Sequence, residues 1–227
     1  MNTLDAEFKN APRLQASLTA AVERKALKYL AARLPLWVNS DHLTLLGLLA
    51  MIAAGACYAA ARWWPPVMLV VNLLLVVNWF GDSLDGTLAR LRHRERPRYG
   101  FYVDHIVDAL GILAILCGLG LSGYLSWPVA LAFLVAYFLL SIDIYLATYT
   151  IGTFRMAYSK LGPTELRILL AVGNVAAFLH PRARLFGDHL LLDVSTIIAI
   201  AVLAVITITS IGRNTATLYR AEAACRK

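Results

Sequence analysis

The chain has 227 residues, of which 59% are hydrophobic and only 15% are charged. Soluble domains carry about a quarter charged residues, so this composition excludes an ordinary soluble domain and favours a membrane protein. The net charge of +7 would raise the question of nucleic acid in a soluble protein, but membrane proteins gather Lys and Arg in cytoplasmic loops near anionic lipid. We therefore expect membrane lipids, and no nucleic acid, as partners.

Residues 1–40 form the first predicted unit, an N-terminal cytoplasmic or interfacial segment. Apolar residues recur at helical spacing between Leu14 and Leu34, with Arg and Lys residues between them, and Pro35 ends the pattern. The pattern predicts a basic amphipathic juxtamembrane helix. Such a helix lies either on the inner membrane surface or against the protein's own cytosolic side.

Six apolar segments follow, each about long enough to cross a hydrocarbon core of about 30 Å. We expect transmembrane helices at about 41–62, 66–90, 101–122, 127–150, 164–180 and 190–212. The predicted fold class is therefore all-α integral membrane, with six transmembrane helices after the juxtamembrane helix. The membrane domain is assigned to residues 41–215, and residues 216–227 are assigned to a cytoplasmic tail.

The distribution of basic residues orients these predicted helices. Of the 21 Lys and Arg residues, 18 lie in the N-terminal segment, in the stretches 90–98 and 155–167, and near the C-terminus. The positive-inside rule places all four regions in the cytoplasm. We expect a multi-pass protein of the plasma (inner) membrane with both termini on the cytoplasmic side, together with any functional site formed by the ends of the spans there.

Two consecutive predicted spans carry four aspartates at their cytoplasmic ends: Asp82, Asp85, Asp104 and Asp108. Within each pair the residues are three or four apart, so each pair shares one helix face. Two adjacent antiparallel helices would direct all four carboxylates to one point, where they need a cation to stay ionised. Oxygen ligands favour Mg²⁺ or Mn²⁺, and four carboxylates favour two ions.

Small and basic residues accompany the aspartates. Gly86 and Ala89 leave room for a ligand near the helix backbone, and Arg90 follows at a fixed offset and offers positive charge to a phosphate. The remaining arginines of the stretch 91–98 are interpreted mainly as determinants of topology.

The spacing of these residues resembles the signature of the CDP-alcohol phosphotransferase family, here Asp82-x-x-Asp85-Gly86-x-x-Ala89-Arg90 and then Gly100-x-x-x-Asp104-x-x-x-Asp108. Asp41 and Thr44 resemble a further family element at the start of the first span, although Ser40 stands where proline is common. Nine residues separate Arg90 from Gly100, where the family more often has eight.

The resemblance implies a transferase of phospholipid biosynthesis, which moves a phospho-alcohol group from a CDP-alcohol to an acceptor hydroxyl and releases CMP. It implies that the four aspartates hold two Mg²⁺ or Mn²⁺ ions and that Asp108 also acts as general base. It further implies a homodimer. The residues that would bind the CDP moiety are Asp41, Thr44, Gly86, Ala89 and Arg90.

The donor and acceptor remain open between two arrangements. CDP-diacylglycerol donating a phosphatidyl group to a small alcohol is slightly favoured, because compact prokaryotic members mostly use it. A CDP-choline or CDP-ethanolamine donor with a diacylglycerol acceptor is the alternative, since residues 148–155 and 164–165 resemble that group.

Candidate residues for the acceptor site lie around and beyond the third predicted span: His105, Asp143, Arg155, Lys160 and Glu165, with Arg167 nearby. Each also has a structural interpretation. The basic residues fit ordinary loop charge, and His105 and Asp143 fit hydrogen-bonding roles within the helices.

A different class of function, a membrane cation transporter, would also place carboxylates within spans. However, the aspartates cluster at one membrane face and the sequence shows no internal repeat. A catalytically silent family member is a further alternative, but all four aspartates are intact, which argues against it.

Overall fold

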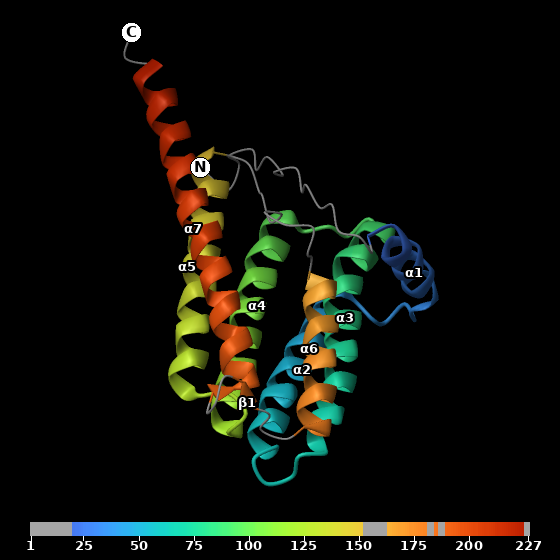
Figure 1. Cartoon of the computed structure of the whole chain (residues 1–227). Coiled ribbons are helices and arrows are strands. Elements are labelled where there is room, and N and C mark those ends of the chain that lie inside the picture. The colour runs from blue at the N-terminus through green and yellow to red at the C-terminus, as the bar shows by residue number, and fades with distance from the viewer. Residues whose placement is uncertain (1–19, 152–162, 181–183, 186–188, 225–227) are drawn as a thin grey trace.

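The computed structural model describes residues 20–151, 163–180, 184–185 and 189–224. The helices of the described residues are α1 (Ala20–Arg33), α2 (Ser40–Ala60), α3 (Val67–Leu91), α4 (Pro97–Ser122), α5 (Trp127–Ile151), α6 (Pro163–Leu179) and α7 (Leu191–Ala224). Helices α2 to α5 alternate in direction, so the start of α2, the end of α3 and the start of α4 lie at one end of the bundle (Figure 1). We call this end, which carries Asp82, Asp85, Asp104 and Asp108, the aspartate end.

Five helices are long and apolar enough to cross a membrane, namely α2, α3, α4, α5 and α7. The chain is therefore a multi-pass, predominantly helical membrane protein, as the sequence predicts. The predicted span at 164–180 corresponds to α6, which has 17 residues and is shorter than these five helices. At 1.5 Å per residue α6 extends about 25 Å, less than a typical hydrocarbon core of about 30 Å.

Two further features of the fold concern its C-terminal part. Helix α7 continues to Ala224, so residues 216–224 of the predicted cytoplasmic tail are helical and continuous with the last span. A short antiparallel hairpin, β1 (Arg184–Leu185) with β2 (His189–Leu190), precedes α7, and the rest of the described fold is helical, as predicted. Strands of two residues are too short to show an alternating pattern in the sequence.

The predicted amphipathic helix is confirmed as α1, which packs on the aspartate end beside α3 (Figure 1). Leu27 and Ala31 of α1 are buried against Leu84 and Leu88 of α3. This face of α1 therefore packs on the protein itself. Its basic residues Arg24, Lys25 and Lys28 are exposed.

Helices α2 and α4 approach each other closely, because glycines stand at the contact. A Cβ on Gly55 would overlap the carbonyl of Ala114, and a Cβ on Gly118 would overlap the carbonyl of Gly55. Small residues are the usual means by which membrane helices bring their backbones together. This contact fixes α4, and with it Asp104 and Asp108, relative to α2.

Hydrogen bonds of polar side chains attach the short helix α6 to α2 and α3. The Tyr58 hydroxyl donates to Asn174 Oδ1 over 2.8 Å, and Asn174 Nδ2 donates to Asn72 Oδ1 over 2.7 Å. Asn72 Nδ2 in turn donates to the carbonyl of Ala171 over 3.3 Å. Buried polar side chains are costly in a membrane unless they are paired, so this network specifies where α6 packs.

Candidate active site

The four aspartates lie on the facing ends of α3 and α4, as the sequence predicts. Asp82 and Asp85 belong to the last turns of α3, and Asp104 and Asp108 belong to the first turns of α4. The carboxylate of Asp108 interacts electrostatically with those of Asp82, Asp104 and Asp85, and with the guanidinium of Arg167. Helix geometry and the reversal of direction between α3 and α4 thus bring the four acids into one site.

Asp85 is oriented from α2. The hydroxyl of Thr44 donates a 2.7 Å hydrogen bond to Asp85 Oδ2, and the Ser40 hydroxyl donates to the Asp85 carbonyl over 3.0 Å. Both donors belong to the first turns of α2, which begins with Asn39 as its N-cap. Thr44, which the family resemblance assigned to the nucleotide, therefore directly contacts one of the four aspartates.

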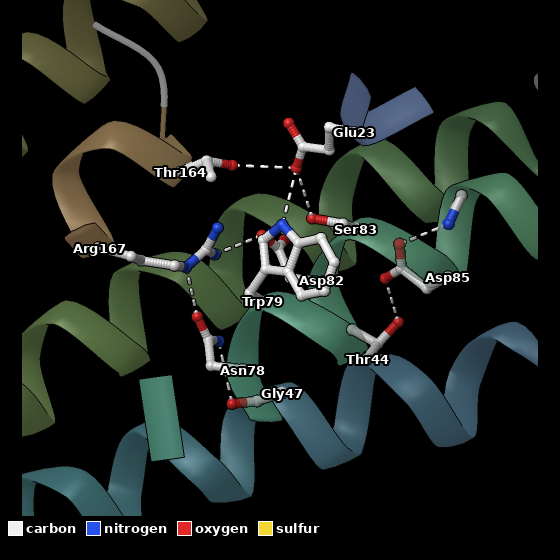
Figure 2. Close-up of polar contacts among 11 residues, drawn as sticks. Glu23, Thr44, Gly47, Asn78, Trp79, Asp82, Ser83, Asp85, Thr164 and Arg167 are labelled. Atoms are coloured by element: carbon white, nitrogen blue, oxygen red, sulfur yellow. Dashed lines mark hydrogen bonds and ion pairs between the residues drawn. The ribbon is translucent and has the colours of Figure 1, made fainter. Parts of the chain in front are cut away.

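Asp82 is paired with Arg167, which reaches across from α6 (Figure 2). The guanidinium donates through Nη2 to Asp82 Oδ2, over 2.5 Å, and through Nε to Asn78 Oδ1, over 2.9 Å. Asn78 is itself fixed by a 3.2 Å hydrogen bond from its Nδ2 to the carbonyl of Gly47. Only 17% of the Arg167 side chain is exposed, so the structure holds this positive charge within the site rather than in the solvent.

The donor set of the aspartate cluster consists of carboxylate oxygens, which are the ligands of hard cations such as Mg²⁺ and Mn²⁺. Throughout the part of the chain that the structure describes, no group of three or more His, Cys, Asp or Glu side chains is arranged to hold a metal ion by itself. Arg167 contacts Asp82, and Thr44 contacts Asp85. Mg²⁺ commonly takes only one or two carboxylates from the protein and its other ligands from substrate phosphates and water, so the cluster fits a cation that binds with a phosphate-bearing substrate.

The other residues assigned to the nucleotide lie at the same end of the bundle. Asp41, in the first turn of α2, pairs with Arg96 from the α3–α4 connection. Arg90 is exposed near the end of α3 and donates to the Thr87 hydroxyl over 3.3 Å. A Cβ on Gly86 would lie 3.4 Å from Arg90 Nη1, so the glycine leaves space for this guanidinium.

The predicted acceptor residues are distributed differently. His105 is buried between the rings of Phe101 and Tyr145, at centroid distances of 4.2 and 4.7 Å. Asp143 faces α7, where it accepts hydrogen bonds from Ser210 and Asn214. The remaining predicted acceptor residues fall outside the description: Arg155, Lys160 and the side chain of Glu165.

Sequence reasoning missed several residues that support the site. Asn78 lies four residues before Asp82 on the same face of α3, and its polar side chain in an apolar span could have identified it. Arg92 was interpreted as a determinant of topology, but its guanidinium donates to the carbonyls of Leu34 and Pro35 over 2.9 and 3.0 Å. Because these partners are 58 and 57 residues away in the sequence, no local sequence pattern predicts these hydrogen bonds.

Two curated proteins are similar to part of this chain. Archaetidylinositol phosphate synthase of Pyrococcus horikoshii is 27% identical over 106 residues, which cover 47% of this chain and 53% of that protein. The enzyme of the same name from Methanothermobacter thermautotrophicus is 34% identical over 113 residues, which cover 48% of this chain and 54% of that enzyme. The chain thus matches about half the length of these relatives.

A wider match comes from the sequence pattern of the CDP-alcohol phosphatidyltransferases, which extends over residues 37–211. The match includes α2 to α6, most of α7 and all four aspartates of the site. It confirms the resemblance drawn from the spacing of those aspartates. The chain is a member of the CDP-alcohol phosphatidyltransferase family, and an enzyme of that family.

Proposed function

We propose that this enzyme transfers a phosphatidyl-type group from a CDP-linked lipid to a hydroxyl of a small phosphorylated polyol, with inositol phosphate as the first candidate. Two relatives are named archaetidylinositol phosphate synthases, and this supports a phosphorylated acceptor over a diacylglycerol acceptor. The observation that carries the proposal is Arg167. Its guanidinium lies within the aspartate site, where an anionic acceptor group would need a cationic partner.

The proposed reaction exchanges one phosphorus–oxygen bond for another. The acceptor hydroxyl oxygen forms a bond to the lipid-linked phosphorus of the donor, and the bond from that phosphorus to the CMP oxygen breaks. Asp108 takes the hydroxyl proton, because a hydroxyl is a poor nucleophile until a positioned carboxylate accepts that proton. CMP leaves with the electron pair of the broken bond.

Each group of residues in the site has an assigned role in this reaction. Asp82, Asp85, Asp104 and Asp108 are the proposed ligands of two Mg²⁺ or Mn²⁺ ions, which when bound supply positive charge to the donor pyrophosphate. The CDP moiety is assigned to residues at the start of α2 and near the end of α3: Asp41, Thr44, Gly86, Ala89 and Arg90. Arg167, with Arg155 and Lys160 before it in the sequence, is assigned to the acceptor phosphate.

Orientation and assembly are part of the same proposal. The positive-inside rule places the aspartate end and both termini in the cytoplasm. A homodimer is proposed from the family resemblance alone. The glycines Gly111 and Gly118 of α4 do not support it, since they face Met51 and Gly55 of α2 within the same chain.

The experiment is a CMP-release assay on purified protein in detergent or vesicles, with Mg²⁺, Mn²⁺ or EDTA. CDP-diacylglycerol or a CDP-linked ether lipid with inositol phosphate should release CMP, and EDTA should stop the release. Asp108→Asn should lower kcat by about 10²–10⁴-fold while nucleotide binding persists. CMP release only from CDP-choline or CDP-ethanolamine with diacylglycerol would contradict the proposed substrates and support the alternative pair.

A further inference from the structure

Glu23 of the juxtamembrane helix α1 reaches the point where α3 and α6 meet (Figure 2). Its Oε1 atom accepts a 2.8 Å hydrogen bond from Trp79 Nε1 on α3 and a 2.9 Å hydrogen bond from the Thr164 hydroxyl on α6. The Ser83 hydroxyl lies 3.5 Å from the same oxygen. One carboxylate oxygen therefore joins three helices, and hydrogen bonds to an ionised acceptor are stronger than those between neutral groups.

Thr164 and Arg167 lie on one face at the start of α6, because they are three residues apart in a helix. Thr164 is attached to α1 through Glu23, and Arg167 is attached to α3 through Asp82 and Asn78. The next hydrogen bonds of α6 to α2 and α3 are at Ala171, one turn further on, and at Asn174, two turns further on. The position of the Arg167 guanidinium thus depends on how firmly the first turn of α6 is held.

Helix α1 is a firm support for this contact. Leu27 and Ala31, one and two turns after Glu23, are 8% and 1% exposed against α3. Trp79 and Asp82 are also three residues apart on α3, so the hydrogen-bond partner of Glu23 and the ion-pair partner of Arg167 share one helix face. Glu23 and Arg167 therefore reach the same stretch of α3 from two different helices.

We propose that Glu23 is a positioning residue for the transfer reaction: through Thr164 it holds the first turn of α6 on α3, and so keeps the Arg167 guanidinium beside the aspartates to receive the anionic group of the acceptor. This inference rests on the proposed function, in which Arg167 binds the acceptor phosphate. It gives α1, which lies outside the family match at 37–211, a role in acceptor affinity.

Steady-state kinetics on Glu23→Ala, Thr164→Val, Arg167→Ala and the double variant Glu23→Ala/Arg167→Ala test the inference. Glu23→Ala should raise KM for inositol phosphate about tenfold, the change that accompanies loss of one charge-assisted hydrogen bond, while kcat and the donor KM stay within about twofold. Thr164→Val should act in the same way, and Thr164→Ser should restore the wild-type KM. The double variant should have the acceptor KM of Arg167→Ala alone, because Glu23 acts through Arg167.

Glu222→Gln, on the exposed last part of α7, is the matched control for removal of a carboxylate and should behave as wild type. An unchanged acceptor KM in Glu23→Ala would overturn the inference. So would a fall in kcat with equal effects on both substrates, or effects of Glu23→Ala and Arg167→Ala that add, since these results describe general destabilisation.

A second measurement needs no turnover and separates this inference from the proposed function. Hydrogen exchange of the backbone amides of residues 164–170 in ligand-free protein should be faster in Glu23→Ala than in wild type, and unchanged in Glu222→Gln. Equal exchange in Glu23→Ala and wild type would overturn the inference that Glu23 holds the first turn of α6. Wild-type protein that released no CMP with any donor would overturn the proposed function, and faster exchange in Glu23→Ala would then still support the attachment of α6 through Glu23.

Discussion

The hydroxyl of Thr44 on α2 donates a 2.7 Å hydrogen bond to Oδ2 of Asp85 on α3. The two residues are 41 positions apart, and the contact connects the start of one helix to the end of the next. A carboxylate that ligates a metal is usually oriented by a hydrogen bond of this kind, and losing such a partner costs about 10–100-fold in metal affinity or activity.

Thr44→Val should therefore raise the Mg²⁺ concentration for half-maximal CMP release by about 10–100-fold, because Asp85 loses the donor that orients it. Thr44→Ser keeps the hydroxyl and should stay near wild type. Titration of Mn²⁺ binding by electron paramagnetic resonance measures the same effect without turnover. Thr217→Val, an exposed threonine on α7, is the matched control. Identical Mn²⁺ affinity in Thr44→Val and wild type would show that this hydrogen bond does not orient a ligand.

Gly118→Ala should destabilise the protein, because its Cβ would overlap the carbonyl of Gly55 where α2 and α4 meet. Overpacking of this kind costs about 1–3 kcal/mol, which corresponds to a loss of about 2–12 °C in Tm for a chain of this size. Thermal unfolding followed by fluorescence in detergent measures the change. Gly173→Ala is the control, since a Cβ there meets nothing within 4 Å. Equal melting of the two variants would contradict the close contact of α2 and α4.

Arg92→Gln should loosen the segment that joins α1 to α2, because the Arg92 guanidinium donates to the carbonyls of Leu34, Pro35 and Val38. Hydrogen bonds from a charged group contribute about 1.5–3 kcal/mol each when buried and less where solvent competes. We expect faster trypsin cleavage after Arg33, measured by mass spectrometry of a digestion time course. Arg94→Gln removes an exposed arginine from the α3–α4 connection, in which Arg92 also lies, and should leave the cleavage rate unchanged.

Asp143→Ala should lower stability without raising the acceptor KM, because the Asp143 carboxylate accepts hydrogen bonds from Ser210 and Asn214 of α7. Removing the Asp143 carboxylate takes away the acceptor of these interhelical hydrogen bonds, and losing a buried hydrogen-bond partner costs about 1–3 kcal/mol. Thermal unfolding and acceptor kinetics on the same preparation separate the two effects. A raised acceptor KM at unchanged Tm would instead assign Asp143 to the acceptor site, which is the other role that its sequence position suggested.

Local spacing predicted much of the fold and of the site. Apolar runs indicated all five helices of spanning length, and amphipathic periodicity indicated α1. The spacing of Asp82, Asp85, Asp104 and Asp108 predicts that they share one site, and the helix ends that carry them were predictable because helix faces and a reversal of chain direction are local properties. The length of α6 and the extension of α7 to Ala224 were less well predicted, since the ends of helices depend on what they pack against.

What the sequence by itself determined is the chemistry: a helical membrane enzyme of the CDP-alcohol class, with a cluster of carboxylates at the facing ends of two helices. Only the tertiary structure decided which side chains hold that cluster in place. Thr44 on Asp85, Arg167 on Asp82, and Glu23 on Thr164 are separated by 41, 85 and 141 residues. Contacts across such separations follow from how helices pack, and periodicity along the chain carries no information about them.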